Sequence, residues 1–481
     1  MPPPELLIAD LPIWARLNDI RFGDFEVKNS AGKGHGVVCR KALTTIEQPL
    51  DESSALTVPH GLVLNVRAVE EYAKEDRNFK QLLDAVGHRS PRADILLFLL
   101  VQTALASRTG HYSAGLSNPW MEYIQFLPRS VSVPSMWTED ERLLLRGTSL
   151  ETAVNAKMLA LVREFDHVQS SSEDIPCWYE LLWQAGAVSL RDWIRLDGLH
   201  RSRCLELPKS GESMVPCIDM VNHAQNPTAY YDENSKNEVT LLLRPGITVS
   251  EGQEVTISYG KAKSAAEMLF SYGFIDKDST AETLVLPLEP LEDDPLGRAK
   301  LVAFGEAPKL HVGRVGGSVV WQSPFVHLMC INEEDGLDFR VLQDTQGVRQ
   351  LRVFWQDGDV TDRTTEFESL VQNHALGAVF RLRAVTVVQE RLQSQLELAR
   401  SYESEKDLGD VRPECLEAAR TLHQIEAGIL EGGIETLEKE GLMQKTLLLS
   451  DENVVAYLGS METAESDLVG EEASSEVDDF S

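Results

Sequence analysis

The sequence predicts an α+β fold, in which a β-rich domain is interrupted by a helical insertion and followed by a mostly helical C-terminal domain. Three observations support this prediction. Signals for short strands and turns occur around residues 20–65 and return from about Met214 to Ile257. The residues between them have helical character, and the last part of the chain contains two long amphipathic patterns. A single sheet domain with an insertion explains this order more simply than three domains, because the helical block has the size of a small domain.

The strand-rich domain is predicted from two separate segments, residues 20–66 and residues 201–284. The first contains "GKGHGVVCRKAL" (Gly32–Leu43), a glycine-rich turn followed by the β-branched strand "GVVC". In the second, the strands "EVTLLLRP" and "EVTISYG" are separated by the turn "PGITVSEGQE".

The helical insertion is predicted over residues 67–200. Its apolar run "ILLFLLV" (Ile95–Val101) is far shorter than the roughly 20 residues of a membrane span, so it predicts a buried helix. In "TEDERLLLRGTSL", Thr138 is a candidate N-cap with Glu141 three residues on, which is the pattern of a capping box.

The C-terminal domain is predicted over residues 285–460, after the acidic and proline-containing "PLEPLEDDP" (Pro287–Pro295), which is typical of a linker. Apolar residues then recur three and four positions apart in two series, which predict two long helices. The series are Leu382, Val385, Val388, Leu392, Leu396 and Ala399, and Leu416, Ala419, Leu422, Ile425 and Ile429. The acidic end, residues 461–481, is expected to be disordered.

The charge balance is acidic, with 45 basic and 76 acidic residues and a net charge of -31. This balance argues against binding the phosphate backbone of a nucleic acid over a broad surface. It favours a basic protein as partner, because an acidic surface raises the encounter rate with one. The alternative is that the acidity serves only solubility.

The six cysteines are scattered, and no two of them form a C-x-x-C pair. This spacing predicts neither a disulfide framework nor a structural zinc site, and we expect no bound metal. The start "MPPPELLIADLPIW" lacks a basic region and is a poor signal peptide. We therefore expect a monomer in the cytoplasm and also in the nucleus, with no membrane contact.

The stretch "CIDMVNHAQNPTAYY" (residues 217–231) places an amide and an imidazole, Asn222 and His223, directly after an apolar segment. Buried polar groups need hydrogen-bond partners, so a lone pair of this kind is most often a satisfied core histidine. The glycines of "GKGHG" by themselves most often serve a turn. No phosphate-binding or dinucleotide-binding glycine pattern is present around them.

Four segments considered together give a more specific indication. They are "GKGHG", "DMVNH", "GQEVTISYG" (Gly252–Gly260) and "AEMLFSYGFI" (Ala266–Ile275). In this order and spacing the chain resembles the SET-domain methyltransferases, and more narrowly the subgroup typified by the Rubisco large-subunit lysine methyltransferase. That subgroup has a split SET domain and a helical substrate-binding domain. Residues Ser117–Leu150 are similar to its insertion, and "LHRSRCLEL" (Leu199–Leu207) resembles its S-R-x-F-type segment.

The resemblance implies S-adenosylmethionine as cofactor and Tyr259 as the catalytic tyrosine. It implies backbone contacts to the cofactor from the glycine turn, a pairing of Arg203 with the cofactor carboxylate, and an ordering role for Asp219. The residues that it assigns to the cofactor are Gly34, His35, Gly36, Arg203, Asp219, Asn222, His223, Tyr259 and Phe274. Those that it assigns to the substrate channel are Tyr272 and Phe274. The chain departs from the pattern at Lys33, Cys204, Gln253 and Ala265.

The implied activity is methylation of a lysine in a non-histone protein, and a basic translational protein such as a ribosomal protein or an elongation factor fits charge and subgroup best. Two alternatives stay open. One is a histidine acceptor, which the same subgroup includes. The other is an inactive SET-fold module that only binds a partner, against which the intact Tyr259, Asn222 and His223 argue.

The resemblance also assigns substrate docking to the helical C-terminal domain. We expect an acidic helix face there, which would bind a basic surface and lose affinity as salt rises. Its charges are Glu390, Glu397, Glu417, Glu426, Glu431, Glu435 and Glu438. A solvated helix face without a partner is the alternative.

Overall fold

The computed structural model describes residues 5–30, 32–45, 55–107, 116, 118–184, 186, 188–343, 347–403, 410–439 and 445–461. The chain folds into two compact units. Unit 1 consists of residues Met1–Arg142 and Thr152–Thr280, and unit 2 of Leu143–Glu151 and Ala281–Ser481. The predicted acidic tail, residues 461–481, lies outside the described residues apart from Met461.

The strands of unit 1 come from both sides of the helical block. They are β1 (Phe25–Ser30), β2 (Gly34–Cys39), β3 (Leu43–Thr44), β4 (Leu56–Val58), β5 (Cys204–Leu207), β6 (Gly211–Met214), β7 (Asn222–His223), β8 (Ala229–Glu233), β9 (Val239–Leu243), β10 (Thr248–Val249) and β11 (Glu254–Ile257). The sheets have the orders β1-β2-β11-β7, β4-β9-β8, β10-β3 and β5-β6. Strands β2, β3 and β4 thus pair with β11, β10 and β9, so the two predicted segments form one strand-rich domain.

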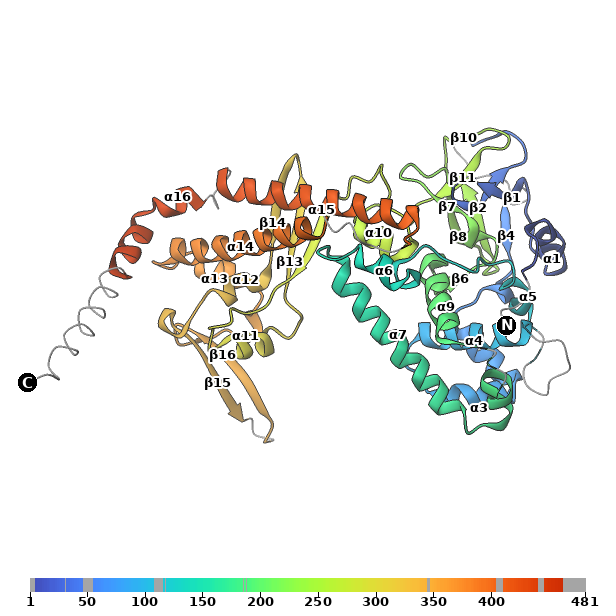
Figure 1. Cartoon of the computed structure of the whole chain (residues 1–481), viewed down its shortest axis with the longest axis horizontal. Coiled ribbons are helices and arrows are strands. Elements are labelled where there is room, and N and C mark those ends of the chain that lie inside the picture. The colour runs from blue at the N-terminus through green and yellow to red at the C-terminus, as the bar shows by residue number, and fades with distance from the viewer. Residues whose placement is uncertain are drawn as a thin grey trace, which may run out of the picture. The chain divides into compact units, whose positions relative to one another are not determined.

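The helical block between β4 and β5 contains α2 (Val66–Glu75), α3 (Arg77–Val86), α4 (Pro91–Ala106), α5 (Pro119–Tyr123), α6 (Glu139–Leu143), α7 (Leu150–Ser172), α8 (Pro176–Trp178) and α9 (Leu190–Arg203). Helix α1 (Leu11–Leu17) precedes the strands, and α10 (Ala265–Tyr272) follows them. Within unit 1, the strands β1, β2, β7 and β11 gather at one end, and the helices α3, α4 and α7 lie toward the other (Figure 1). The predicted insertion is therefore helical.

Helix α4 forms where the apolar run predicts it. Ser90 caps its N-terminus by accepting a hydrogen bond from the Ala93 amide, and Pro91 occupies the first helical position. The whole run Ile95–Val101 is buried in the core of unit 1. Among the described residues, no helix is both long and apolar enough to cross a membrane. The capping box of Thr138 and Glu141 also forms. The side chain of each residue accepts a hydrogen bond from the backbone amide of the other.

Unit 2 contains two small antiparallel sheets besides its helices. The strands are β12 (Thr283–Pro287), β13 (Lys309–Val315) and β14 (Ser318–Gln322) in one sheet, and β15 (Leu337–Gln343), β16 (Arg349–Trp355) and β17 (Gly358–Asp359) in the other. The helices are α11 (Gly297–Phe304), α12 (Pro324–Met329), α13 (Phe367–Val371), α14 (Gly377–Glu403), α15 (Pro413–Lys439) and α16 (Lys445–Leu449). Residues Pro287–Pro295, predicted as a linker, lie between β12 and α11 inside this unit.

The two predicted amphipathic helices are α14 and α15, which pack along each other (Figure 1). Their predicted apolar residues are buried or half-buried, and α15 also packs on β13 and β14. Gly432 permits that approach, because a Cβ there would come within 2.7 Å of a Val319 methyl group. The α+β fold class is confirmed, although the sheets of unit 2 were not individually predicted.

The prediction of an exposed acidic helix face is wrong for one residue, Glu426. The side chain of Glu426 is buried in unit 2, where it accepts hydrogen bonds from the backbone amide and the hydroxyl of Ser149 at 2.9 and 2.5 Å. The helical period of the sequence could not predict this contact, because Ser149 is 277 residues away in the sequence. The other six glutamates of the predicted face are exposed.

Burial raises the pKa of Glu426 to about 7, against the hydrogen bonds from Ser149. A carboxyl whose pKa is higher in the folded than in the unfolded state contributes stability below the unfolded pKa, which is lost as the pH rises through the folded pKa. The window runs from about pH 4.5 to about pH 7. Over this window the free energy of unfolding falls by about 3 kcal/mol, at 1.36 kcal/mol per pKa unit.

We expect Glu426→Gln to remove this pH dependence, because an amide can still bond Ser149 but does not ionise. Thermal unfolding of the full chain should show equal stability of both proteins near pH 5 and greater stability of the variant at pH 8. A variant that loses stability with rising pH as steeply as the wild type would show that Glu426 does not titrate in this range.

Candidate active site

The glycine turn lies between two strands that bring it next to Asn222. Residues Gly34–Cys39 form β2, which pairs with β1 on one side and with β11 on the other, and β11 runs parallel to β7. Gly34 has a φ of +77°, which a side chain would strain. Gly36 has almost no free space, since a Cβ there would stand 2.4 Å from Glu254 Oε1, 2.7 Å from Ser30 Oγ and 2.8 Å from Asn222 Nδ2.

Glu254, the first residue of β11, links the sequence motifs around Gly36. Its Oε1 accepts hydrogen bonds from Ser30 Oγ and from Asn222 Nδ2, both at 2.8 Å. Lys33 Nζ lies 3.4 Å from Oε2. Burial alone would raise the pKa of Glu254, but the two hydrogen bonds and the Lys33 ammonium outweigh it and lower the pKa. The amide of Asn222 is thereby fixed beside the glycine turn, 3.4 Å from the carbonyl oxygen of His35.

We expect Gly36→Ala to destabilise the protein by about 1–3 kcal/mol, because the methyl group displaces the hydrogen-bonded side chains around Glu254. The matched control is Gly61→Ala, since Gly61 is exposed and a methyl group there would have open space around it, with no neighbouring atom within 4 Å. Thermal denaturation of both variants measures the difference. Equal stability of the two variants would mean that the space at Gly36 is not needed.

His223 uses both ring nitrogens inside the protein. Nδ1 accepts a hydrogen bond from the Tyr259 backbone amide at 3.0 Å, so Nε2 carries the proton and donates to Asp276 Oδ2 at 3.2 Å. Gln225 donates to the same carboxylate oxygen at 2.6 Å. Burial would raise the pKa of Asp276, and its hydrogen bonds lower it on balance. The imidazole therefore positions Tyr259 and is not free to bond a ligand.

Tyr259 follows β11 and is held at three points. Its hydroxyl donates to the Val221 carbonyl at 2.8 Å, its amide donates to His223, and its carbonyl accepts from Lys263 Nζ at 2.8 Å. Burial strongly raises the pKa of the phenol, so it is neutral at pH 7. Because the hydroxyl proton is used by Val221, the oxygen has lone pairs left to accept a hydrogen bond.

Two further aromatic residues surround Tyr259. The ring of Tyr272 lies 4.6 Å from that of Tyr259, and the ring of Phe274 lies 6.4 Å from both. Gly273 separates them at a φ of +81° at the end of α10, where a Cβ would come within 2.6 Å of the Ser132 backbone. Lys263 Nζ lies 2.6 Å from the Tyr272 hydroxyl and 4.7 Å from the centre of its ring.

Arg203, the last residue of α9, is oriented by Asp219. Its guanidinium donates to the Asp219 carbonyl at 3.0 Å and lies 3.4 Å from the carboxylate. The carboxylate is fully buried and also accepts a hydrogen bond from Tyr123 Oη, which in turn accepts from the Cys217 amide. Asp219 therefore orders the chain around Arg203 through its protein partners.

A cavity of about 270 Å³ lies between Arg203 and the ring of Tyr259, whereas the glycine turn, Asn222, His223 and Phe274 are not among its lining residues. Its walls include Arg203, Asp219, Val221, Tyr259, Lys263 and Tyr272. Cys204, Glu206, Glu212 and Tyr231 also line it. The cavity thus combines several cationic side chains, a neutral phenol, aromatic faces and three carboxyl groups.

The predicted site residues fall into three groups. His35, Gly36 and Asn222 meet around Glu254, and Gly34 lies at the start of the same strand. Arg203 meets Asp219, and the other four form an aromatic cluster, namely His223, Tyr259, Tyr272 and Phe274. Sequence reasoning missed the positioning residues Glu254, Lys263, Asp276 and Tyr123. Glu254 lies within one of the four motifs, Lys263 lies between two of them and Asp276 directly follows the last, and that proximity was the available signal.

The chain was compared with known proteins, and no family model matches it. It is 28% identical over 327 residues to SET domain-containing protein 8 of Schizosaccharomyces pombe, which covers 66% of this chain and 70% of the relative. It is 28% identical over 196 residues to the pea Rubisco large-subunit N-methyltransferase, over 38% of each chain. It is 23% identical over 238 residues to the S. pombe ribosomal lysine N-methyltransferase set10, over 48% of this chain and 38% of the relative.

A solved structure of the SET domain of LSMT bound to lysine and AdoHcy superposes with a TM-score of 0.65. The sequence identity is 19%, and the match covers 92% of both chains. This likeness shows the fold. The fold and the relatives make the SET-domain methyltransferases the class of protein to which this chain is similar. The chain has homologues in that class, and the subgroup similar to the Rubisco large-subunit methyltransferase fits it, as the sequence motifs predict.

Proposed function

We propose that this chain transfers a methyl group from S-adenosylmethionine to a lysine of a non-histone protein. The observation that carries the proposal is a cavity lined by the neutral phenol of Tyr259, the cation of Arg203 and the ring of Tyr272. Similarity to lysine N-methyltransferases over part of the chain supports the same activity.

The residues around the cavity fit the cofactor by their chemistry. Arg203 lines the cavity in an orientation set by Asp219, and a guanidinium suits a carboxylate such as that of the amino-acid part of S-adenosylmethionine. Gly34 presents bare backbone, with nothing within 4 Å of the position of a Cβ. In this proposal Gly34–Gly36 and Asn222 hold the cofactor, and Phe274 borders it. When bound, S-adenosylmethionine supplies an electrophilic methyl group.

The acceptor amine must be neutral to react. A lysine with a pKa near 10.4 is neutral in about one molecule in a few thousand at pH 7, which corresponds to roughly 4–5 kcal/mol. A cavity that removes water lowers that pKa. The faces of Tyr259 and Tyr272 hold the amine without offering it a negative charge, and alignment contributes several kcal/mol. The lone pairs of the Tyr259 hydroxyl orient the amine, so no strong general base is required.

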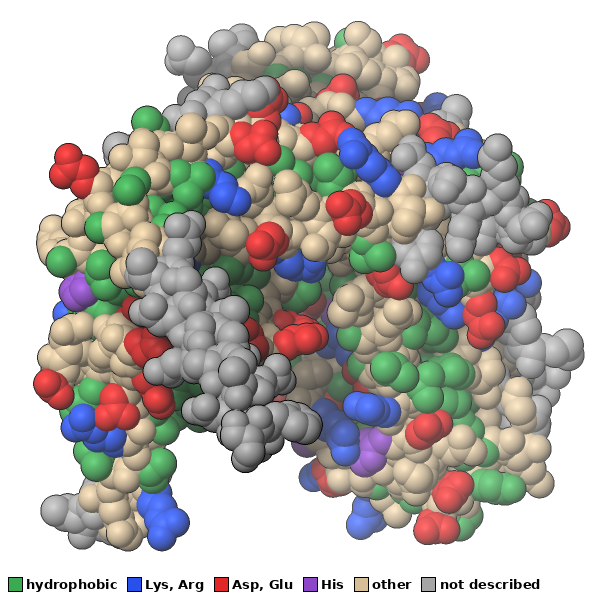
Figure 2. Space-filling view, turned by 60° about the vertical axis from the view of Figure 1, so that its left-hand side comes forward, with side chains coloured by type: hydrophobic (Ala, Val, Ile, Leu, Met, Phe, Trp, Pro, Cys, Tyr) green, Lys and Arg blue, Asp and Glu red, His purple; other side chains and the backbone are tan. Residues whose placement is uncertain are grey.

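A basic translational protein is the substrate class that we propose. The net charge of -31 and the subgroup resemblance support it, as does similarity to a ribosomal lysine methyltransferase. The exposed glutamates of α14 and α15 would contribute to docking. On the face shown in Figure 2, acidic and basic side chains are interspersed, so attraction to the partner would arise from many separated charges. Such attraction weakens as salt rises.

The test is to incubate a whole-cell extract with the purified chain and labelled S-adenosylmethionine, and then to identify the labelled residue by mass spectrometry. We expect a labelled lysine in a basic protein, absent when Tyr259→Phe replaces the wild type. A labelled histidine would establish the alternative acceptor. Absence of any label, in extracts depleted of endogenous methylation, would contradict the enzymatic proposal and favour a binding module.

A further inference from the structure

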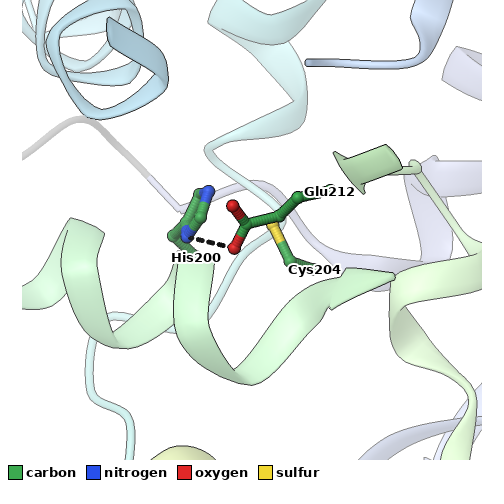
Figure 3. Close-up of side chains that lie close together, drawn as sticks. All are labelled: His200, Cys204 and Glu212. Atoms are coloured by element: carbon green, nitrogen blue, oxygen red, sulfur yellow. Dashed lines mark ion pairs between the residues drawn. The ribbon is translucent and has the colours of Figure 1, made fainter. Parts of the chain in front are cut away.

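Three side chains of types that can bind a metal ion come together where α9 ends and β5 begins (Figure 3). They are His200, Cys204 and Glu212, whose donor atoms all lie within 4.8 Å of one another. His200 precedes Cys204 by one helical turn. Cys204 pairs with Met214 across β5 and β6, so Glu212, two positions from Met214, is the diagonal neighbour of Cys204 on the same sheet face. Local geometry therefore determines all three positions.

Within the described part of the chain, the imidazole of His200 lacks a hydrogen-bond partner at one of its nitrogens. His200 is buried, and its Nε2 has no hydrogen-bond partner among the described residues. Its Nδ1 faces Glu212 Oε1 at 4.0 Å, which is too long for a hydrogen bond (Figure 3). Nδ1 is the nitrogen that faces the other two side chains, so a metal ion bound there would use the one lone pair of the neutral ring, and Nε2 would keep the proton. Burial also lowers the pKa of His200 to about 4, which leaves the ring neutral at pH 7.

We propose that His200, Cys204 and Glu212 form a Zn²⁺ site at the wall of the cavity. One imidazole, one thiolate and one carboxylate are a donor set that zinc accepts, and three protein ligands leave a fourth position open. In a tetrahedral site, bonds of about 2.0–2.3 Å place the ligand atoms roughly 3.3–3.8 Å apart. The donor atoms must therefore approach one another by up to about 1.5 Å, and the side chain of Glu212 is half-exposed, which leaves it room to move.

The site has a consequence that rests on the proposed function. Cys204 and Glu212 line the same cavity as Tyr259 and Tyr272, so a bound zinc ion occupies part of the space for the acceptor side chain. Zinc is also cationic, as is an incoming lysine ammonium, and both are attracted by Glu206 and Glu212. Zinc is therefore expected to inhibit methyl transfer by excluding the acceptor.

Affinity should be moderate. Metal-bound imidazoles usually donate their second N–H to an acceptor, and loss of such a partner lowers metal affinity about 10–100-fold. The Nε2 of His200 has no such acceptor among the described residues. This places the site among reversible, inhibitory sites and not among structural ones.

The experiment titrates the purified full chain, without cofactor or substrate, with Zn²⁺ against a chromophoric chelator, and with Co²⁺ followed by absorption. We expect one equivalent bound and a thiolate-to-cobalt charge-transfer band. Cys204→Ser should lower zinc affinity at least 10-fold and abolish the band. The control is Cys177→Ser, a partly buried cysteine outside the cluster, which should bind as the wild type does. Glu212→Gln, at a half-exposed strand position, tests the site in a variant that folds readily.

Zinc affinity and a cobalt band that survive in Cys204→Ser would overturn the proposal. In methylation assays, zinc should inhibit the wild type at the concentration that fills the site, and each variant is compared with itself without zinc. Binding that depends on Cys204 but leaves methylation unaffected would overturn the inhibitory role. Because the binding assays use neither cofactor nor substrate, failure of the proposed methyltransferase activity would be seen separately.

Discussion

Tyr259→Phe is expected to lower the turnover number about 10²–10³-fold, the usual effect of losing one hydrogen-bonding group at a reacting centre. The substitution removes only the hydroxyl, while the rings of His223, Tyr272 and Phe274 keep their packing around the remaining phenyl group. Affinity for S-adenosylmethionine should change little. A loss in turnover without a loss of cofactor affinity indicates a group that acts in the transition state.

The matched control for this prediction is Tyr72→Phe. Tyr72 is also buried, and its hydroxyl also donates to a backbone carbonyl, that of Leu116, but it lies outside the cavity walls. Its variant should keep the wild-type turnover once loss of stability is accounted for. Steady-state kinetics with the identified substrate measures both variants. Equal turnover in Tyr259→Phe and the wild type would mean that Tyr259 is only a core aromatic residue.

Asp197→Ala is expected to destabilise the protein by about 3–5 kcal/mol, because it leaves the partly buried Lys157 and Arg201 without their counter-charge, while Arg92 keeps its ion pair with Glu164. Asp197 on α9 is almost fully buried, and its carboxylate lies 2.6 Å from Arg92, 2.8 Å from Lys157 and 3.0 Å from Arg201. These residues come from α4, α7 and α9, so the network holds the helices of unit 1 together. Arg201 also donates to the Phe270 carbonyl in α10, next to the aromatic cluster.

The pH dependence of this stabilisation has a definite sign. Burial would raise the pKa of Asp197, but Arg201, Lys157 and Arg92 lower it on balance. A carboxyl with a lowered folded-state pKa contributes stability above its unfolded value, near 3.9, and loses it as the pH falls through the folded value. Urea unfolding at pH 7 measures the destabilisation by Asp197→Ala. The control is Glu71→Ala, which removes an exposed ion pair. Similar stability of both variants would show that the network does not determine stability.

The motifs that could be predicted from the sequence are those in which residue type and local order suffice. Strand and glycine-turn signals predicted that Gly34, Gly36, Asn222 and Tyr259 belong to one domain, and the structure brings Gly36 and Asn222 together at Glu254. The long helices α14 and α15 were predictable because their apolar residues repeat with the helical period.

Contacts between distant segments could not be predicted in this way. Glu426 has the sequence environment of a solvent-facing helix residue, and only its contact with Ser149 places it inside. Residues Leu143–Glu151 belong to unit 2 although they lie within the predicted insertion, and nothing in their composition marks them. His200, Cys204 and Glu212 match no metal-binding spacing, because the helix-to-strand transition brings them together.

The most direct test of the central claim is calorimetric titration of the purified chain with S-adenosylmethionine. We expect a one-to-one complex with the wild type. Asn222→Ala, which removes the amide bonded to Glu254 beside the glycine turn, should weaken binding at least 10-fold, about 1.4 kcal/mol, while a cooperative thermal transition without cofactor persists. A folded wild-type protein that binds no S-adenosylmethionine would contradict the claim that these residues form a methyl-donor site.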